Sequence, residues 1–589
     1  MKNTFSKLIK YVGLTVLLGM WSCTDYLDQT PDAAVSEEDL FGTYRDFQGF
    51  LDPAYSLVMD LNGHALTTSH CIGGEVHNST PWGSGARGNN GDYLAMCPSG
   101  ATLQSNFWCT DDNLLGDTDS GLWIDSWRGI RIANIALEKL PLLTGATEEE
   151  RKLIEGQAYF LRAFFHWELI RAWGGMPYVE KAYSPTDDLK LPRLTYQQST
   201  DKLVEDLNKA ASLLPTNWDN TNVGAAAKGS NTGRATKGAA LSLKAKALLY
   251  AGSPLMNKFS GGSAEYNKTY LEKSAAAAWE VIQLANQGVY ALVPWKDYQK
   301  NFATSDNTMP WTSETIFEKV KSGVGSGELT NRLGRIFTPV RMGGNAVKDC
   351  PNQAYVDLFE MADGSRYKEA YDSDNNKRWN GRDPRFRHAI CVDRDKMGTA
   401  ASTVIELFDG GKDRTAGVVT PYYIRKFWPV GVNTIDKAWN GFRWNTPHLR
   451  LAEVYLIYAE AVSEAYSPSS TAPGASLTAV EAVNIVRRRA NMPDVTATPA
   501  GYTSFRELLR NERFVELCFE GHWWYDIRRW YVATQPEYKL VTSLNFDKNW
   551  TKFTRSVIFN RVFDERHYWM PIPRSQTLLY PEFGQNPGW

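Results

Sequence analysis

The chain has 589 residues, and its 64 basic and 66 acidic side chains leave a formal net charge of -2. This balance argues against a nucleic-acid or polyanion ligand, because the chain carries no strong excess of one charge. The length corresponds to roughly three or four units of domain size, unless a repeat architecture joins them. Aromatic residues make up 13% of the chain, which suits large cores and also the stacking of sugar rings.

The N-terminus has the features of a lipoprotein signal peptide. Three lysines precede an apolar run from Tyr11 to Met20, which is too short to span a bilayer, and Ser22 and Cys23 follow it. We predict a signal peptide over residues 1–22, cut before Cys23, whose lipid anchors the protein to a membrane. Met20 and Trp21 depart from the usual lipobox, and the alternative is a simple secretory signal with Cys23 as an ordinary thiol. No other run is apolar for long enough to cross a membrane.

Two polar regions follow the signal peptide. From Thr24 to about Pro53 the composition suits a tether, with residues 23–40 as its lipidated start. From His64 to Asp119 the chain is rich in Gly, Asn, Ser and Thr. This composition indicates a long irregular loop, and long loops in compact proteins are usually functional.

Helical periodicity begins at Trp123 and recurs along the chain in antiparallel pairs. Gly174, Gly175 and Pro177 end one of these helices, as expected at a helix C-terminus. The arrangement resembles a degenerate, interrupted tetratricopeptide solenoid, so we predict a mostly α fold with about four such pairs and little β structure. The predicted helices are Trp123–Leu143 with Glu148–Trp173, Tyr196–Leu214 with Lys237–Gly252, Tyr270–Gly288 beside that second pair, and Leu449–Tyr466 with Leu477–Ala490.

A second irregular region lies between Tyr290 and Asn445, where the helical period fades. It holds short β-prone runs at 315–317 and 422–424, and several aromatic residues. We expect this region to pack beside the first irregular loop.

The stretch from Phe505 to Trp530 predicts an amphipathic helix docked on the core, with Cys518 inside it as a small core residue. Glu512 and Glu516 fall within its apolar stripe, where carboxylates are costly unless they are paired. We predict that they form structural ion pairs, and the candidate cations are Arg487, Arg488, Arg489, Arg528 and Arg529. A retaining glycosidase pair is the competing hypothesis, since residues at i and i+4 lie about 5 to 6 Å apart. It is disfavoured because both acids share a stripe with apolar residues rather than facing a cleft.

Sugar binding needs exposed aromatic rings for stacking and planar polar partners for hydroxyl groups. Trp82 is the best candidate, because no helical or strand periodicity surrounds it. Each candidate has an alternative role as a loop anchor tucked into the core. The further predicted ligand-binding residues are the aromatic Trp108, Trp311 and Tyr298 and the polar Asn106, Asp111, Asp112, Arg87 and Arg335.

Metal and cofactor signatures are weak. His64, His70 and His77 are spaced so that no two share one helix face. Asp117, Asp119 and Gly121 only faintly match a calcium loop, so we predict no required metal and no cofactor. An exported chain permits disulfides, and Cys71, Cys97 and Cys109 are the candidates for a local bridge.

Several separated phrases together resemble the SusD/RagB family of outer-membrane nutrient-binding lipoproteins. In chain order they are CTDYLDQTP after the signal, AYFLRAFFHWELIRAWGGMPYV (Ala158 to Val179), VDLFEMADG (Val356 to Gly364), LRLAEVYLIYAEAV (Leu449 to Val462), AVNIVRRRA (Ala482 to Ala490), NERFVEL with FEGHWWYDIRRW in the 505–530 stretch, and PIPRSQTLLYPEFGQNPGW (Pro571 to Trp589). The resemblance covers essentially the whole mature chain. It implies one globular unit with a SusD-like N-terminal region over 41–320 and a SusD/RagB C-terminal region over 321–589.

The resemblance also implies a role. Members of the family are held on the cell surface by an N-terminal lipid and cap a SusC-like TonB-dependent transporter, to which they pass glycans without cleaving them. Ligand contacts in the family lie in variable loops, so no binding residue carries over from the matching phrases. Two alternatives stay open: the same architecture with peptide or another nutrient as cargo, and a secreted glycan-active enzyme.

Overall fold

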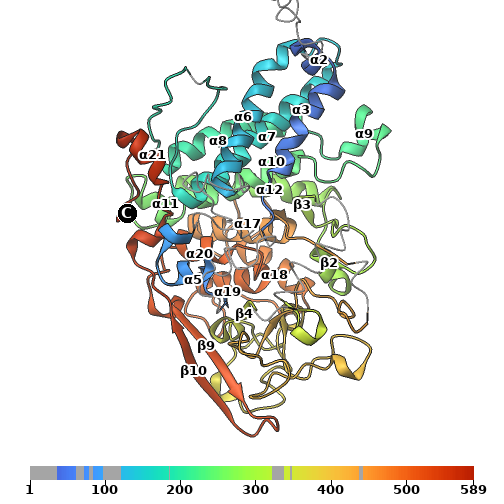
Figure 1. The fold of residues 1–589 in the computed structure, drawn as a ribbon, viewed down its shortest axis with the longest axis vertical. Helices are drawn as coiled ribbons and strands as arrows, with labels where there is room; N and C mark the ends of the chain where they lie inside the picture. The colour runs from blue at the N-terminus through green and yellow to red at the C-terminus, as the bar shows by residue number, and fades with distance from the viewer. Residues whose placement is uncertain are drawn as a thin grey trace, which may run out of the picture.

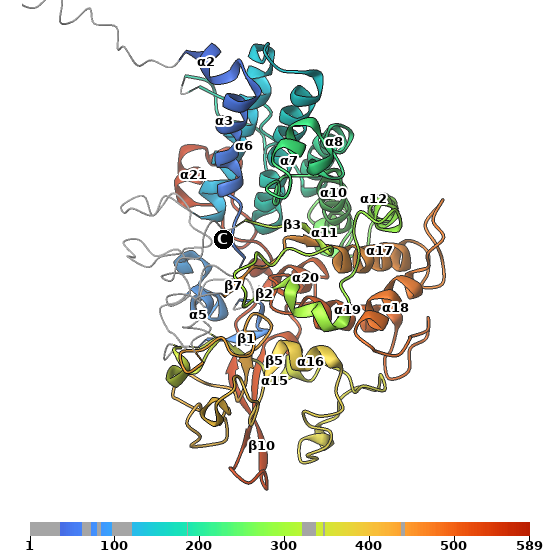
Figure 2. The same ribbon diagram turned by 90° about the vertical axis from the view of Figure 1, so that its right-hand side faces the viewer.

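The computed structural model describes residues 36–61, 72–78, 84–96, 121–184, 186–320, 337–344, 348–436 and 442–589. Over these ranges the protein is mostly helical, and long helices in its upper half stand above a lower half of short strands and loops (Figures 1 and 2). The predicted tetratricopeptide-like helical scaffold is confirmed. None of the described helices is long and apolar enough to cross a bilayer.

The scaffold is a chain of helices in which each packs against the next: α6 on α7, α7 on α8, α8 on α10, α10 on α12, α12 on α17, and α17 on α18 and α19. α12 therefore joins the second helical pair to the third across the long irregular region. The bounds are α6 (Leu122–Lys139), α7 (Glu148–Trp173), α8 (Tyr196–Leu213), α10 (Lys237–Ala251), α12 (Lys268–Asn286), α17 (Leu451–Ala465), α18 (Ala479–Arg489) and α19 (Phe505–Leu517).

Local capping explains why these helices begin and end where they do. Thr147 accepts a hydrogen bond from the backbone of Glu150, whose carboxylate accepts one from the Thr147 N–H, so a capping box opens α7. Gly174 ends the same helix with a φ of 86°, a conformation that favours glycine. A second capping box, formed by Thr195 and Gln198, opens α8.

The N-terminal segment is folded where the sequence predicts a tether. α2 (Glu37–Phe41) and α3 (Tyr44–Ser56) precede the scaffold, and α3 packs on α6 and α7. Phe41, Phe47 and Leu51 are buried there. The tether prediction is therefore wrong from Ser36 onward, because these three apolar side chains supply a helical face that its polar composition obscures.

Short antiparallel strand pairs organise the irregular regions. Val76 lies opposite Pro351, and Asn78 donates to the Asp349 carboxylate at 2.6 Å, so the described parts of the two irregular regions do pack side by side. The pairs are β1 (Val76–His77) with β4 (Cys350–Pro351), β2 (Ala303–Thr304) with β7 (Arg443–Trp444), β3 (Thr315–Phe317) with β8 (Leu449–Arg450), β5 (Ile390–Cys391) with β6 (Tyr423–Ile424), and β9 (Leu540–Phe546) with β10 (Phe553–Asn560).

Two of these strands, β3 and β6, coincide with the predicted β-prone runs. The β9–β10 hairpin, which projects at the bottom of Figure 1, was not among the expected strands. The remaining short helices are α5 (Ser84–Asn89), α9 (Asn222–Ala226), α11 (Pro254–Lys258), α15 (Gln353–Val356), α16 (Pro384–Ala389), α20 (Trp523–Arg529) and α21 (Arg574–Leu579).

The predicted helix of the 505–530 stretch is broken in the structure. α19 ends at Leu517, Cys518 is its C-cap, and Phe519 and Gly521 take positive φ values of 63° and 82° before α20 begins. The Lys426 ammonium donates to the carbonyls of Glu516 at 3.1 Å and Cys518 at 3.0 Å. The prediction that Cys518 lies inside a continuous helix is thus wrong. The break is stabilised by Lys426, a cation from another segment, which binds the backbone carbonyls that no longer have a partner within the helix.

The cysteines divide between the described and the undescribed residues. Cys350, Cys391 and Cys518 are buried free thiols. Cys71, Cys97 and Cys109, the predicted candidates for a bridge, lie outside the described residues, as does Cys23.

Candidate functional site

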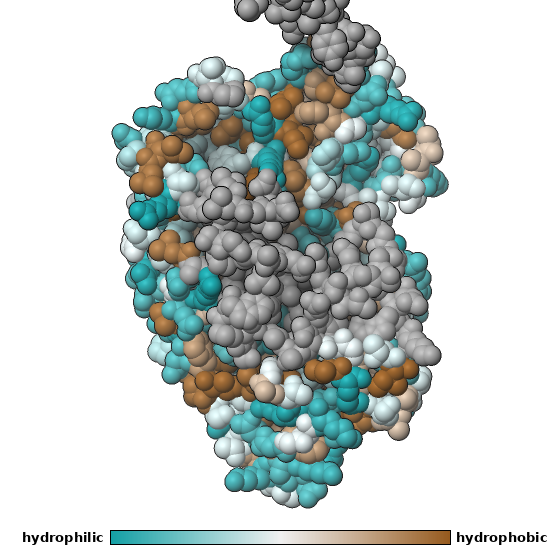
Figure 3. All heavy atoms as spheres, in the orientation of Figure 1, coloured by the Kyte–Doolittle hydropathy of each residue, from teal (hydrophilic) through white to brown (hydrophobic). Residues whose placement is uncertain are grey.

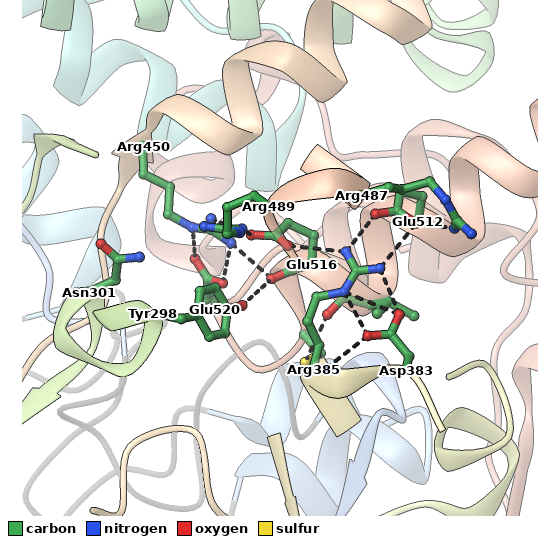
Figure 4. Close-up of polar contacts among 12 residues, drawn as sticks. Tyr298, Asn301, Asp383, Arg385, Arg450, Arg487, Arg489, Glu512, Glu516 and Glu520 are labelled. Carbon is green, nitrogen blue, oxygen red and sulfur yellow. Dashed lines mark hydrogen bonds and ion pairs between the residues drawn. The ribbon is translucent and has the colours of Figure 1, made fainter. Parts of the chain in front are cut away.

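Glu512 and Glu516 lie at the centre of a buried ion cluster (Figure 4). The Glu512 carboxylate accepts from Arg385 at 2.5 Å and from Arg487 at 2.9 Å. Glu516 contacts Arg450 at 2.7 Å, Arg385 at 3.2 Å and also Arg489. Both carboxylates are almost fully buried, at 1% and 0% exposure.

The cluster joins four distant parts of the chain. Arg385 comes from α16, Arg450 from β8, and Arg487 with Arg489 from α18, so the cluster ties α19 to all three elements. Further acids complete the cation pairs: Glu314 and Glu520 on Arg450, Glu360 on Arg487, and Asp383 on Arg385.

The electrostatics of the cluster favour ionised carboxylates. Burial alone would raise the pKa of Glu512, but the charges of Arg385 and Arg487 outweigh it and hold this pKa below its usual value. The pKa of Glu516 is also lowered, since burial is outweighed by Arg489, Arg450 and Arg385. Neither group can act as a general acid here, because each is ionised and neither opens to a solvent-filled cleft.

Most of the predicted sugar-binding residues cannot be placed. Arg87 lies in the last turn of α5 and is half-buried. Tyr298 is 2% exposed: its ring stacks on Trp295 at 5.1 Å between centroids, and the Arg489 guanidinium lies over it at 4.6 Å. Tyr298 thus presents no ring face to solvent in this structure. The predicted sugar-binding residues that lie outside the described residues are Trp82, Trp108, Asn106, Asp111, Asp112 and Arg335.

Trp311 differs from Tyr298, because it lines an open pocket. Its side chain is half-buried, and it belongs neither to the hydrophobic core nor to the apolar side chains that pack on that core. The pocket has a volume of about 430 Å³ and lies between Trp311–Ile316, the end of α12 with the residues after it, and the 216–236 segment that holds η4 (Trp218–Asn220) and α9. This volume falls within the range of ligand sites, about 300–1,000 Å³.

Polar side chains surround Trp311 in this pocket. The Asp219 carboxylate accepts from the Asn231 amide at 2.7 Å and from the Gly229 N–H at 3.2 Å, which fixes both side chains at the wall. Arg234 is paired with Asp52 at 2.9 Å. The pocket therefore combines the half-buried Trp311 and the buried Trp218 and Tyr290 with amide, carboxylate and hydroxyl groups. The polar lining residues include Asn217, Asp219, Asn220, Asn231, Gln287, Thr312 and Ser313.

Sequence reasoning named Trp311 as a candidate but did not name its polar neighbours. The 216–236 segment lies between two predicted helices, and its run of Asn, Thr and Gly was the available signal. α10, which follows that segment, packs on α12 and on β3, and this tertiary packing brings the segment near Trp311.

A different hollow, of about 600 Å³, is mainly apolar. Trp123, Trp127 and Phe583 line it together with Leu189 and Leu579, which are 61% and 75% exposed. Figure 3 shows apolar side chains gathered over α21, at the upper left of the view. Asp187, Asp188, Lys190 and Gln576 border this hollow as well, but its exposed lining is mainly apolar, so we do not choose it as the candidate site.

Of the histidines and aspartates weighed above as weak metal ligands, the structure describes only His77. His77 is buried, which lowers its pKa to about 4, with Arg561 contributing in the same direction. His64, His70, Asp117 and Asp119 lie outside the described residues. Among the residues that the structure describes, no group of three or more His, Cys, Asp or Glu side chains could hold a metal ion.

The fold and the pocket define the class: a helical, tetratricopeptide-like protein with a loop-built polar pocket. Two family models match the chain, one described as "SusD family" over residues 313–589 and the other as "Starch-binding associating with outer membrane" over residues 25–249. The chain belongs to the SusD family.

Curated relatives are similar in sequence over most of the chain, and solved structures share its fold. SusD-like protein P2 of Formosa agariphila is 24% identical over 99% of this chain and 100% of its own. A SusD-like protein from Bacteroides fragilis is similar in structure, with a TM-score of 0.71 and 24% identity over 95% of this chain and 100% of that one. A surface glycan-binding protein A from Bacteroides fluxus has a TM-score of 0.59 and 19% identity over 93% of this chain and 100% of that one.

Proposed function

We propose that this protein is a cell-surface lipoprotein that captures oligosaccharides in the Trp311 pocket and delivers them to a SusC-like TonB-dependent transporter. The observation that supports this proposal most strongly is the geometry of that pocket, where a tryptophan outside the core lies among planar amide and carboxylate groups. An aromatic face stacks on the apolar face of a sugar ring, and the amides bond its hydroxyl groups.

Anchoring and delivery rest on the N-terminus and the family. In this proposal the signal peptide spans 1–22, lipid on Cys23 holds the protein at the outer membrane, and the regions 41–320 and 321–589 form one unit. Cys23→Ala removes the lipidation site, so the protein should leave the membrane fraction. Variant protein that stays bound to membranes to the wild-type extent would contradict lipid anchoring.

The proposed role is binding and not cleavage. The two acids that best match a glycosidase pair, Glu512 and Glu516, are committed to arginines in the buried cluster. We therefore expect no release of reducing ends. Release that survives Glu512→Gln would point to an enzyme with its acids elsewhere.

Affinity electrophoresis against a panel of neutral polysaccharides tests the capture step. We expect at least one polysaccharide to retard the wild-type protein, and Trp311→Ala to weaken that retardation because the stacking face is lost, at a cost of about 1 kcal/mol or more. Trp127→Ala, which removes a half-buried tryptophan from the apolar hollow, is the matched control and should migrate as the wild type. A peptide cargo would instead leave every lane unretarded.

A further inference from the structure

A separate pocket lies along α19, away from the Trp311 pocket, and its wall residue Tyr502 donates to Glu360 of the ion cluster at 2.5 Å. Its volume is about 560 Å³, and it shares no lining residue with the Trp311 pocket. α15, residues 502–511, Trp523 and the 3-10 turn Pro536–Tyr538 form its walls. This volume is again within the range of ligand sites, about 300–1,000 Å³.

Three arginines line this pocket, and one of them lacks an acid. Arg366 is paired with Glu507 at 2.6 Å, and Arg506 with Glu464 at 2.5 Å. Arg510, one helical turn after Arg506, makes no hydrogen bond or ion pair within the described residues, and its buried Nε has no partner. Its guanidinium rests 4.8 Å from the centre of the Trp530 ring.

The Nε–H of Arg510 is costly as it stands, because burial removes water from this donor and no protein acceptor replaces that water. The guanidinium rests against the Trp530 ring, and its buried Nε–H and the N–H donors of its two Nη atoms have no protein acceptor within the described residues. A planar anion that accepts two of them would satisfy the side chain.

The surroundings of Arg510 suit a sugar as the carrier of that anion. Tyr538 and Tyr502 line the same pocket as half-buried rings, and Ser504 and Thr503 contribute hydroxyl groups, of which that of Thr503 already donates to Glu507 at 2.8 Å. Burial raises the pKa of the Tyr538 hydroxyl while the Arg510 charge lowers it, which agrees with their facing one space. Aromatic rings beside hydroxyl and guanidinium donors match a sugar ring that bears a negative group.

The two acids of the pocket leave Arg510 available. Glu507 is taken by Arg366, and its other oxygen accepts from the Thr503 backbone at 2.8 Å. Glu537 is solvent-exposed, so water screens its charge.

We propose that this second pocket binds an acidic sugar residue, with the carboxylate or sulfate group paired to Arg510 and the sugar ring against Tyr538. The inference goes beyond capture at Trp311, and either site can fail without the other.

Calorimetric titration at low salt tests this proposal with three probes of equal length: an oligogalacturonate, a sulfated galactan oligosaccharide and a neutral galactan oligosaccharide. We expect at least one acidic probe to bind the wild-type protein about 10-fold or more tightly than the neutral probe, because charged hydrogen bonds are the stronger ones. The two acidic arms decide between carboxylate and sulfate.

Substitutions at Arg510 and at two control positions test whether the acidic probe binds in the second pocket. Arg510→Gln should weaken the acidic probe by about 10-fold or more, whereas Arg510→Lys, which keeps the charge but loses the planar fork, should lose less. Arg488→Gln, which removes an exposed arginine paired with Glu481 and Asp494, and Trp311→Ala should both bind the acidic probe as the wild type does. Circular dichroism of each variant verifies its fold.

Three results would overturn the proposal: acidic and neutral probes that bind the wild type equally, full affinity in Arg510→Gln, or no acidic probe that binds at all. Inorganic sulfate that binds as tightly as the sulfated oligosaccharide would overturn the saccharide part. If Trp311→Ala loses binding of the neutral glycan but keeps binding of the acidic probe, the two ligands bind at different sites. Failure of one proposed site can then be told from failure of the other.

Discussion

At the scale of single residues, buried charge holds the C-terminal part of the fold together. Sequence reasoning required cations for Glu512 and Glu516, and two of the five candidates, Arg487 and Arg489, are indeed partners. Arg385 and Arg450 were missed, since they come from α16 and β8, far away in sequence. Periodicity shows that a carboxylate faces the core, but only the tertiary fold supplies its partner.

Arg385→Met should destabilise the protein strongly. It leaves Glu512 without one of its two cations, and breaking a buried pair costs about 3–5 kcal/mol. Arg488→Met is the control, because its partners lie at the surface and its loss should leave the free energy of unfolding unchanged. Equal denaturant midpoints for the two variants would contradict a structural role for the cluster.

Glu75 should make stability depend on pH. Burial raises its pKa from 4.5 to about 8, although the Phe519 N–H donates to its carboxylate. Between these values the folded state keeps a proton that the unfolded state releases, so this stabilising contribution is complete below pH 4.5 and is lost as pH rises through about 8.

The matched comparison is Glu75→Gln, which has no proton to lose. The difference in unfolding free energy, wild type minus variant, should fall by about 1.4 kcal/mol per pH unit within that window. Chemical denaturation from pH 4 to pH 9 measures it, and a difference that stays constant would show that Glu75 ionises normally in the fold.

At the scale of elements, the sequence predicted the long helices best. The bounds of α7 match in full, because its capping box and Gly174 are local signals. The break after Leu517 could not be predicted, since the Lys426 side chain that binds the freed carbonyls lies in another part of the chain. The β9–β10 hairpin was missed because its second strand has no buried positions and so shows little alternation of burial.

Packing between α6 and α7 depends on Gly129, which has no side chain at the point where the two helices meet. A Cβ on Gly129 would lie 2.2 Å from the ring of Phe165, so Gly129→Ala should destabilise by about 1–3 kcal/mol despite its better helix propensity. Gly49→Ala, in α3, meets no atom within 4 Å and should stabilise by about 0.5–1 kcal/mol. Thermal unfolding of both variants checks the pair, and a shift in the same direction would contradict the close contact.

At the scale of the whole molecule, sequence and structure contribute different parts of the account. Aromatic and helical periodicity with the matching phrases was enough to predict the scaffold and the family, because those signals are spread over the entire chain. The site was predicted only in part. Trp311 was one of the candidates named after Trp82, whereas Asp219 and Asn231 line the same pocket through tertiary packing that no local pattern encodes.

The central claim is that a glycan binds at Trp311. The most direct measurement is a crystal structure of the protein with an oligosaccharide from the polysaccharide that retards it in electrophoresis. The account predicts a sugar ring stacked on Trp311 and hydroxyl groups bonded to side chains of the 216–236 segment. An oligosaccharide bound elsewhere, with the Trp311 pocket empty, would contradict it.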